Sequence, residues 1–484
     1  MSSPRHAIAP TDLAPLCVDL DGTLIRSDML WESFVRMIKT KPWYVFAVPF
    51  WWSIGRARLK AELASRVKVD AANLPYNQPL LEFLRVEKER GRKLLLVTAS
   101  DKALADPVAQ HVGLFDEVMA SDGKLNLRGH NKGLRLAERF GKGGFDYAGN
   151  SSVDLPVWEQ AREAIVVNGD SGLAVRAEKI SKVGKVFAPR APIAKGIFHA
   201  LRPHHWVKNL IIFVPLITSH QLTRFDLAIS AFLAFLAFCL CASGVYITND
   251  LLDVESDRHH PRKRKRPFAS GELPLQYGLV LGPLLFAASL AIGWKLHAGF
   301  LAVLGVYVVL TTGYSWWWKQ IALVDVFCLA GLYTIRLIGG HEATHIEYSF
   351  WLLAFSMFIF LSLALVKRFL ELKAARQRNH TALHGRGYAA DDTELVAMLG
   401  SNCGYLAVLV LALYVNSQEV RLLYHRPTLL LLICPALLFW ISRIWLVAHR
   451  GQMHDDPIVF ALKDRVSYVI AAMALFFLWL ATGH

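Results

Sequence analysis

Two acids near the start of the sequence are spaced for chemistry on a phosphate. Asp19 and Asp21 stand in DLDGT, directly after the apolar run LCV. A carboxylate that follows a buried parallel strand lies where α/β folds bind their ligands. Of two acids on such a turn, one can attack phosphorus as a nucleophile and the other can act as general acid and base. An ordinary turn capped by an aspartate is the alternative for an isolated pair.

Three further acids follow an almost wholly apolar stretch, residues 231–248. Asp250, Asp253 and Asp257 are spaced i, i+3, i+7, which predicts that they share one face of a helix. This spacing suits Mg²⁺ that bridges to substrate phosphates, because Mg²⁺ prefers oxygen ligands and keeps several waters. We therefore expect these acids to bind a magnesium ion. The alternative is a solvated helix end in front of the basic loop that follows.

Cationic and polar residues at other expected helix ends could bind an anionic substrate. Lys319 lies in the short loop of GYSWWWKQIALVD, whose last residue opens the next apolar stretch. Positive charges at membrane helix ends also arise from orientation alone, and Arg336 could instead belong to an internal ion pair. We interpret the basic run 262–266 mainly as an orientation signal. The candidate substrate-binding residues of this half are Lys208, Asn209, Asn249, Tyr314, Lys319, Asp325, Arg336, Lys367 and Arg368.

The elements that would position the first two acids form an α/β pattern over residues 1–187. The apolar runs LCVDLDGT, KLLLVTAS, FDYAGNS and AIVVN alternate with helical stretches, which predicts a mainly parallel sheet. The stretch from about 24 to 80 has the length of a helical cap. A basic Pro/Ala stretch at 188–197 is interpreted as a linker to the second domain, 198–484.

The cap contains an unusually aromatic segment, PWYVFAVPFWW, at 42–52. Two interpretations stay open. The segment could be the buried core of a soluble cap, or it could form an amphipathic surface that lies on a membrane. The flanking basic residues that favour the second interpretation are Lys39, Lys41, Arg56 and Arg58.

Apolar runs of membrane length dominate the chain beyond residue 198. We expect an all-α bundle of nine spans, at about 206–219, 227–249, 275–296, 299–314, 321–339, 349–367, 394–415, 427–448 and 466–482. If the N-terminus is inside, the connections that carry most lysines and arginines are cytoplasmic and the C-terminus lies outside. No apolar leader occupies residues 1–15, so the first domain should stay in the cytoplasm. We thus expect a multi-pass protein of the inner membrane with both sites facing the cytoplasm.

The bulk composition agrees with a membrane protein that handles anions. The 484 residues are 54% hydrophobic and carry a formal net charge of +14. Such an excess orients a membrane protein and meets anionic headgroups or phosphorylated substrates, and the membrane half argues against nucleic acid as a partner. The six cysteines show no metal-binding spacing and are expected to be small buried hydrophobes. Oligomeric state is not fixed by the sequence.

With these elements in place, residues 15–187 resemble the haloacid dehalogenase (HAD) phosphatase superfamily. The matching order is DxDGT, the strand-end Thr98, Lys132 and an acidic motif that ends in Asp154. The resemblance implies that Asp19 is the nucleophile and Asp21 the acid and base. It also implies that Thr98 and Lys132 hold the phosphoryl group. The implied magnesium ligands are Asp19, Asp21, Asn150 and Asp154, one of them through a main-chain carbonyl.

The fourth motif departs from the family pattern. HAD proteins usually have GDxxxD where this chain has GNSSVD, residues 149–154. Asn150 removes one negative charge but still offers an amide oxygen to Mg²⁺. The resemblance therefore implies an active phosphatase, with a degenerate regulatory domain as the alternative.

Residues 195–484 resemble the UbiA superfamily of intramembrane transferases, through NDxxDxxxD at 249–257. Its members typically join a prenyl diphosphate to an acceptor. One branch instead transfers phosphoribose from phosphoribosyl diphosphate (PRPP) to decaprenyl phosphate. The stretches that resemble this branch are LRPHHWVKN at 201–209, YSWWWK, LVKRFLEL at 365–372 and HDDPIVFALKDR at 454–465.

The two resemblances together imply a bifunctional, Mg²⁺-dependent enzyme. The membrane domain would transfer 5-phosphoribose from PRPP to polyprenyl phosphate, with Asp250 and Asp253 as catalytic acids. The HAD domain would then remove the 5-phosphate, giving a lipid-linked ribose for cell-envelope glycan synthesis. One rival is a prenyltransferase for an aromatic acceptor; another is a transporter or scaffold with a degenerate HAD domain. Prenyl chain length is not fixed by the sequence.

Overall fold

The computed structural model describes residues 13–121, 127–170, 172–188, 191–378, 386–453 and 456–482. The chain divides into two compact units. The first comprises Met1–Arg202 with Tyr246–Pro283, and the second comprises Pro203–Val245 with Leu284–His484. The first unit therefore contains the α/β part together with the acidic segment that follows the long apolar helix.

A six-stranded parallel sheet forms the centre of the first unit, in the order β3-β2-β1-β4-β5-β6. The strands are β1 (Leu16–Val18), β2 (Leu94–Asp101), β3 (Glu117–Ser121), β4 (Asp146–Gly149), β5 (Glu163–Val166) and β6 (Lys182–Val186). This confirms the expected parallel α/β domain. The edge strands β3 and β6 were not predicted, because they are largely half-buried or exposed and lack a continuous apolar run.

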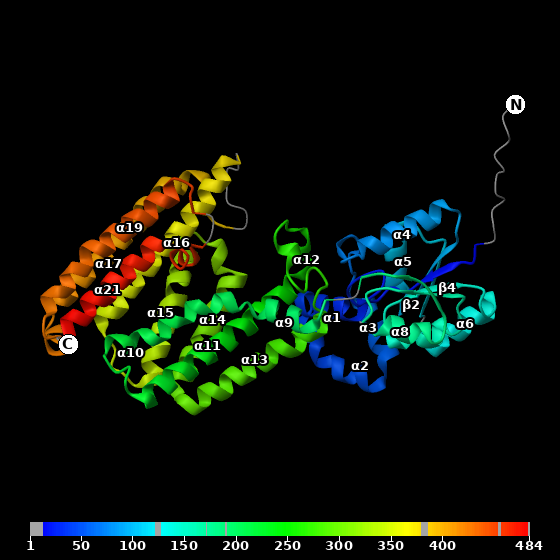
Figure 1. Ribbon diagram of the computed structural model, residues 1–484, viewed down its shortest axis with the longest axis horizontal. Coiled ribbons are helices and arrows are strands. Elements are labelled where there is room, and N and C mark those ends of the chain that lie inside the picture. The colour runs from blue at the N-terminus through cyan, green and yellow to red at the C-terminus, as the bar shows by residue number, and fades with distance from the viewer. Residues whose placement is uncertain are drawn as a thin grey trace. The chain divides into compact units, whose positions relative to one another are not determined.

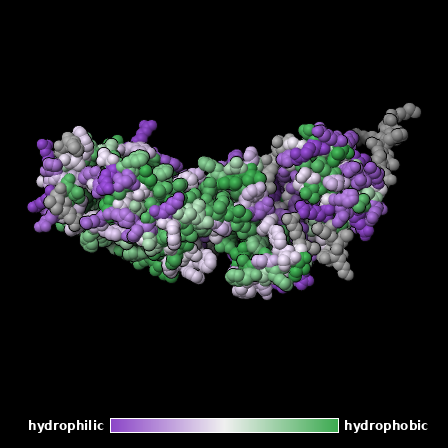
Figure 2. Space-filling model, turned by 90° about the horizontal axis from the view of Figure 1, so that it is seen from below, coloured by the Kyte–Doolittle hydropathy of each residue, from purple (hydrophilic) through white to green (hydrophobic). Residues whose placement is uncertain are grey.

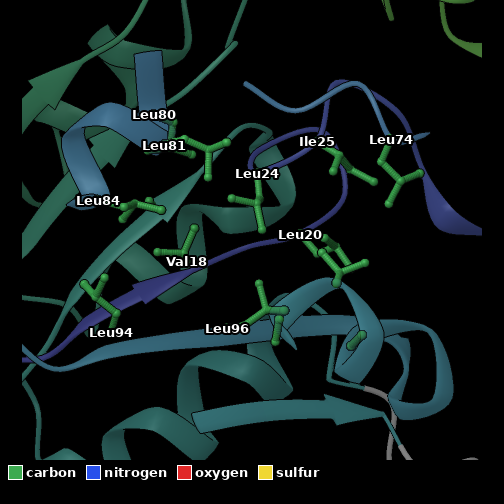
Figure 3. Packing of buried hydrophobic residues seen from close by; sticks show 14 of the residues in the cluster. Val18, Leu20, Leu24, Ile25, Leu74, Leu80, Leu81, Leu84, Leu94 and Leu96 are labelled. Carbon is green, nitrogen blue, oxygen red and sulfur yellow. The ribbon is translucent and has the colours of Figure 1, made fainter. Parts of the chain in front are cut away.

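The central strand β1 is buried on both faces and directs the residues that follow it. Leu16 pairs with Leu94 on β2 and with Asp146 on β4, so β1 lies between them. Figure 3 shows Val18 and Leu24 packed with leucines of β2 and of α4 (Gln78–Glu89). The DLDGT turn therefore leaves the carboxyl edge of a rigid core, where parallel sheets place ligand sites.

Three helices and two 3₁₀ turns lie between β1 and α4. They are α1 (Met29–Thr40), η1 (Pro42–Ala47), α2 (Val48–Ile54), α3 (Arg56–Arg66) and η2 (Ala71–Asn73). Asp28 caps α1 by accepting a hydrogen bond from the Leu30 amide at 2.8 Å. A small core around Met37, Trp51 and Leu63 joins these helices, so the cap has apolar packing of its own.

Seven helices in the described part of the chain are long and apolar enough to cross a membrane. They are α11 (Phe225–Leu252), α13 (Leu275–Leu296), α14 (Ala298–Trp316), α16 (Phe350–Gln377), Ala390–Val415, which contains α17 (Thr393–Val415), Pro427–His449, which contains α19 (Ile433–His449), and α21 (Arg465–Thr482). In Figure 2 green, apolar residues are spread over the helical part among purple patches, whereas the visible face of the α/β part is mainly purple. The helices are labelled in Figure 1.

The expected nine spans are not confirmed. The stretch 206–219 is instead an 11-residue 3₁₀ segment, η4 (Pro203–Phe213), followed by the short α10 (Val214–Thr218), which contains Pro215. The stretch 321–339 belongs to α15 (Val324–Thr344), a 21-residue helix whose apolar run is interrupted by Asp325, Arg336 and Glu342. Proline and charged residues therefore account for the difference.

Candidate functional site

Asp19 lies at the end of β1 with one carboxylate oxygen fixed and one available. Its Oδ1 accepts hydrogen bonds from the Lys132 ammonium at 2.8 Å and from the Leu20 amide at 2.9 Å. Within the described residues, no hydrogen bond reaches Oδ2. Lys132 comes from α6 (His130–Phe140) and is itself buried. The arrangement leaves Oδ2 as the atom that can attack phosphorus.

Asp21 is held by the strand β2 on one side and by the cap on the other. The Ser100 hydroxyl donates to Oδ2 at 2.6 Å, and the Met29 amide at the start of α1 donates to Oδ1 at 2.8 Å. Burial, aided by the nearby Asp28, raises the pKa of Asp21 to about 6, although Lys60 opposes the shift. A carboxyl group with a pKa near neutrality can both give and take a proton.

A buried hydrogen-bonded chain connects Asp19 to the fourth motif. Lys132 also donates to the Tyr147 hydroxyl at 2.7 Å, and Tyr147 donates to Asp154 Oδ1 at 3.2 Å. Asp154 Oδ2 accepts from the backbone amides of Asn150 and Ser151, each at 3.0 Å. Hydrogen bonds therefore hold the fourth motif in a defined conformation, although Asn150 stands where the family usually has aspartate.

Asn150 lies directly against the DLDGT turn. A Cβ added at Gly22 would come within 2.2 Å of the Asn150 Nδ2, and Gly22 has a φ of +77°. Only glycine fits this position, because it combines a left-handed backbone with the close approach of another side chain. The turn and the fourth motif are therefore packed together.

Asp19, Asp21 and Asp154 line one cavity of about 510 Å³. Among the described residues, no three His, Cys, Asp or Glu side chains form a complete metal cage. Asp19, Asn150 and Asp154 nevertheless line the same cavity. Burial raises the pKa of Asp19 and the charge of Asp154 adds to the shift, against Lys132, so negative charge is crowded here. These hard oxygen ligands fit a Mg²⁺ ion that completes its shell with water and substrate.

Thr98 does not line this cavity, although its neighbours do. It is fully buried, and its hydroxyl accepts a hydrogen bond from the Ser100 amide at 3.0 Å. Among the described residues of β2, Ala99 and Asp101 contribute to the cavity wall. The role of Thr98 in holding a phosphoryl group stays a prediction.

The second acidic group consists of Asp250, Asp253 and Asp257. Two arginines neutralise part of its charge. Asp250 accepts from Arg202 at 2.7 and 2.9 Å and from Arg266 at 3.0 Å. Arg266 also donates to Asp257 at 2.6 Å, so one guanidinium bridges Asp250 and Asp257. The single helix face expected for the three acids is interrupted, because α11 ends at Leu252 and Asp257 lies on the next helix. The last residue of the basic run is therefore a counter-charge, and its interpretation as mainly an orientation signal does not cover Arg266.

The acidic group retains oxygen atoms that no arginine covers. α11 ends at Leu252, and Asp253 stands half-buried before α12 (Val254–His259). In the described part of the chain, no ion pair or side-chain hydrogen bond reaches the Asp253 carboxylate. Asp257 Oδ1 is buried without a hydrogen-bond partner, and the Lys263 ammonium lies 3.8 Å from it. Burial raises the pKa of Asp257, against the opposing charge of Arg266. The Asp253 carboxylate and Asp257 Oδ1 are hard oxygen ligands that fit a Mg²⁺ ion.

Two ion pairs within the first unit join the cap helix α1 to α12. Arg258 donates to Glu32 at 2.6 and 3.1 Å, and both side chains are less than a tenth exposed. Arg36 pairs with Glu255, and those two side chains are each 29% exposed. Since α1 also holds Asp21 through the Met29 amide, one helix contacts both the acid of the first site and the segment of the second.

Glu32→Gln is expected to destabilise the α1–α12 contact by about 3 kcal/mol, because it leaves the Arg258 guanidinium buried without its counter-charge. Hydrogen–deuterium exchange of the α1 amides in the full chain measures this opening. Glu255→Gln is the matched control on the same two helices, and it should cost less than about 1 kcal/mol because that pair is partly exposed. Equal protection in wild type and Glu32→Gln would contradict the prediction.

In the second unit, two lysines share one carboxylate. Lys208 of η4 and Lys367 of α16 each lie 3.4 Å from the Asp456 Oδ2. Burial favours a raised pKa, but both lysines outweigh it and hold the pKa of Asp456 below its usual range. Two ammonium groups on one carboxylate leave a net positive charge, so this cluster can bind an anion.

Asp325 and Arg368, both predicted to bind substrate, are paired with each other instead. They are completely buried and lie 2.5 Å apart. The Tyr388 hydroxyl donates to Asp325 at 2.7 Å, and the Arg386 guanidinium lies 3.7 Å from it. Arg386 in turn donates to Tyr314 at 2.9 Å. A buried pair of this kind leaves little charge for a ligand, and the role of these two residues in substrate binding stays a prediction.

The remaining candidates of the second unit are placed differently. Arg336 is buried and donates to Asn209 Oδ1 at 2.6 Å, with its guanidinium over the Tyr333 ring. The Lys208 ammonium lies over the same ring, 5.7 Å from its centroid. Lys319 is half-buried in η6 (Trp318–Gln320). The structure therefore brings Lys208, Asn209 and Arg336 around Tyr333.

Sequence reasoning missed three residues that complete these sites. Arg202 and Asp456 stand inside the quoted stretches LRPHHWVKN and HDDPIVFALKDR, so the resemblance to one branch was the available signal. Tyr147 lies in FDYAGNS, which the sequence indicates as a buried strand, so no signal marked its hydroxyl as part of the site. The other half of the HDDP motif, residues 454–455, lies outside the described residues.

Comparison with known proteins identifies both parts of the chain. Residues 211–481 match the UbiA prenyltransferase family, and residues 16–159 match the haloacid dehalogenase-like hydrolases. An uncharacterised protein, y4nM, of Sinorhizobium fredii is 36% identical over 95% of this chain and 89% of its own length. A decaprenyl-phosphate phosphoribosyltransferase of Mycolicibacterium smegmatis is 37% identical over 39% of this chain and 61% of its own.

A solved structure gives a further similarity. The UbiA homolog from Archaeoglobus fulgidus, bound to GPP and Mg²⁺, is 15% identical, with a TM-score of 0.45 over 58% of this chain and 99% of that one. The family match covers more than half of the sequence, and the relative from Sinorhizobium spans nearly all of it. The chain belongs to the UbiA prenyltransferase family and carries an N-terminal haloacid dehalogenase-like hydrolase domain.

Proposed function

We propose that the protein is a bifunctional enzyme that builds a lipid-linked ribose. Its UbiA domain transfers 5-phosphoribose from PRPP to polyprenyl phosphate, and its HAD domain removes the 5-phosphate from the product. The product, polyprenyl-phosphoryl ribose, serves cell-envelope glycan synthesis. The name of the mycobacterial relative supports the first reaction, and the presence of a hydrolase domain on the same chain supports the second.

The observation that carries this proposal is the excess of positive charge at the Lys208–Lys367–Asp456 cluster. PRPP brings a diphosphate and a 5-phosphate, and the acceptor brings a third anionic group. A prenyl diphosphate with a neutral aromatic acceptor needs fewer cations. Two lysines that share one carboxylate suit the more anionic pair of substrates.

In the transfer step, an oxygen of the lipid phosphate attacks the anomeric carbon of the ribose. The bond from that carbon to the diphosphate breaks as the new carbon–oxygen bond forms, in an oxocarbenium-like displacement. No strong base is needed because the acceptor is already an anion. Lys208 and Lys367 bind and orient the anionic groups. Magnesium bound by Asp253 and Asp257, with Asp250 beside them, would neutralise the diphosphate leaving group.

In the hydrolytic step, Asp19 Oδ2 attacks phosphorus and the bond from phosphorus to the ribose 5-oxygen breaks. Asp21 gives its proton to that oxygen, and then takes a proton from the water that cleaves the aspartyl phosphate. Lys132 fixes Asp19 and offsets its charge as the phosphate approaches. Magnesium bound by Asp19, Asn150 and Asp154 would offset the charge of the phosphoryl oxygens.

The membrane topology follows from the same proposal. The soluble domain and both sites face the cytoplasm, where PRPP is available, and the C-terminus lies outside. Nine crossings of the inner membrane would require α15 and the η4–α10 segment to cross together with the seven apolar helices. The excess of lysine and arginine in alternate loops supports this orientation.

A direct assay tests the proposal. Purified protein in lipid nanodiscs is incubated with Mg²⁺, polyprenyl phosphate and PRPP that carries ¹⁴C in the ribose. We expect the label to move into the lipid phase, first with and then without the 5-phosphate. Lipid that stays unlabelled would refute phosphoribosyl transfer, and a prenyl diphosphate offered with 4-hydroxybenzoate tests the rival activity.

A further inference from the structure

The cap carries an aromatic face whose large apolar side chains are exposed to solvent. Its side chains come from η1 and α2 and point away from the cap core. Phe46 is 88% exposed, which is extreme for a large apolar side chain in a folded domain. The exposed residues that form this aromatic face are Trp43, Phe46, Phe50, Trp52 and Ile54.

The opposite side of the same segment is packed, so the exposure is not a sign of an unfolded loop. Trp51 is buried in the cap core, and Tyr44 and Val48 pack against that core. The Arg66 guanidinium lies 4.8 Å from the centre of the Trp51 ring. The segment is therefore amphipathic, with one side anchored and the other presented outward.

The charge around the aromatic face matches an anionic surface. Residues 33–61 contain six basic residues and no acidic one. Lys39, at the end of α1, is exposed, and Lys41 is half-buried at the start of η1. Aromatic side chains bordered by lysine and arginine are the usual composition of helices that lie in the headgroup layer of a bilayer.

The first unit also contains the ends of two membrane spans. Residues 246–252 of α11 and 275–283 of α13 belong to this unit, and both helices are candidate spans. The end of a span lies at the bilayer surface. The ion pairs between α1 and α12 connect the cap to the segment that leaves α11. The cap is therefore tied to the segment that follows a candidate span.

The cavity of the hydrolase site reaches both the aromatic face and a span. Trp52 of the aromatic face and Gln276, in the first turn of α13, line the same cavity as Asp19 and Lys132. Leu30 and Trp31 add apolar wall on the cap side. Such an apolar wall suits a phosphate whose other end carries a lipid chain.

We propose that the aromatic face is a membrane-docking surface that inserts into the headgroup layer of an anionic bilayer. Docked in this way, the cap presents the hydrolase cavity to phosphate monoesters whose other end is a lipid. This preference for a lipid-anchored substrate rests on the proposed function, whereas the docking itself does not. A second copy of the chain and a soluble protein are the competing occupants of the face.

Photo-crosslinking of the full chain in nanodiscs tests the docking. p-Benzoylphenylalanine is placed at Phe46, and in a control protein at Leu134 of α6, an exposed apolar position outside the cap. The nanodiscs contain phosphatidylglycerol and phosphatidylethanolamine. We expect lipid adducts at position 46 and none at 134. Adducts with protein at position 46, or equal lipid labelling at both positions, would overturn the docking surface.

An activity measurement tests the substrate preference with Phe46→Ser combined with Phe50→Ser. Both side chains are exposed and neither lines the cavity, so the fold should be retained. We expect hydrolysis of the lipid-linked 5-phosphate in nanodiscs to fall about tenfold, because interfacial binding scales with buried apolar area. Hydrolysis of soluble p-nitrophenyl phosphate should stay unchanged, and Leu134→Ser should change neither rate.

The outcomes separate the two ideas. Equal losses on both substrates, or no loss on the lipid, would overturn the substrate preference. If the wild-type protein hydrolyses neither substrate, the proposed phosphatase activity fails, while the crosslinking result still decides whether the aromatic face meets the bilayer.

Discussion

Asp19→Asn is expected to stop removal of the 5-phosphate while phosphoribosyl transfer continues, so the 5-phosphorylated lipid accumulates. An amide cannot attack phosphorus, and loss of a nucleophile should reduce the dephosphorylation rate by at least about a thousandfold. The measurement is thin-layer separation of the labelled lipids formed from ¹⁴C-PRPP. Release of phosphate at the wild-type rate would show that Asp19 is not the nucleophile.

The control for this variant must separate chemistry from folding. Lys132 is buried and loses its carboxylate partner in Asp19→Asn, so some loss of stability is expected. Asp28→Asn makes the same chemical change in the wall of the same cavity, where Asn can still cap α1. It should keep activity within about tenfold, since it affects only the environment of Asp21. Thermal unfolding of both variants completes the comparison.

The first site could be predicted from sequence because its main signals are local. A short apolar run followed by DLDGT predicts a carboxylate at the end of a parallel strand, and β1 ends just before Asp19 as expected. The contact of Lys132 with Asp19 joins residues 113 apart. No periodicity reports such a contact, so it could be anticipated only through the resemblance to a family.

The second site shows where spacing stops being informative. The i, i+3, i+7 spacing predicts one shared helix face, but α11 ends at Leu252 and Asp257 lies on α12. The spacing also does not indicate the arginines that pair with Asp250 and Asp257. Asp325 and Arg368 illustrate the same limit. A charge in an apolar helix indicates either a ligand or a partner, and only tertiary packing shows that these two residues pair with each other.

The sequence left two interpretations open for the aromatic segment at 42–52. In the fold, one side of the segment is buried in the cap core and the other side is exposed. A run so rich in large apolar residues has no clear period, so sequence cannot assign its two sides. In the folded cap, Trp51 faces the core while Phe46 and Phe50 face outward. Within this segment the 3₁₀ geometry of η1 passes directly into the α geometry of α2, and this local change of side-chain period is not visible in the hydropathy.

Asp253→Asn is the sharpest test of the second acidic group. Asp250 is the weaker choice, because its removal would leave Arg202 and Arg266 without their shared carboxylate, and a loss of activity could then reflect misfolding. In the described part of the chain Asp253 forms no ion pair, so its replacement leaves no basic side chain without a partner. Its replacement should therefore remove a magnesium ligand with little effect on stability.

We expect Asp253→Asn to lower kcat/KM for phosphoribosyl transfer by about a hundredfold or more, because less charge on the leaving diphosphate is neutralised in the transition state. The Mg²⁺ concentration for half-maximal rate should rise as well, which a purely structural residue would not cause. Glu255→Gln removes the same charge two residues away, from a side chain that pairs with Arg36. If both variants lose kcat/KM equally, the effect comes from the overall negative charge of the segment and not from metal binding.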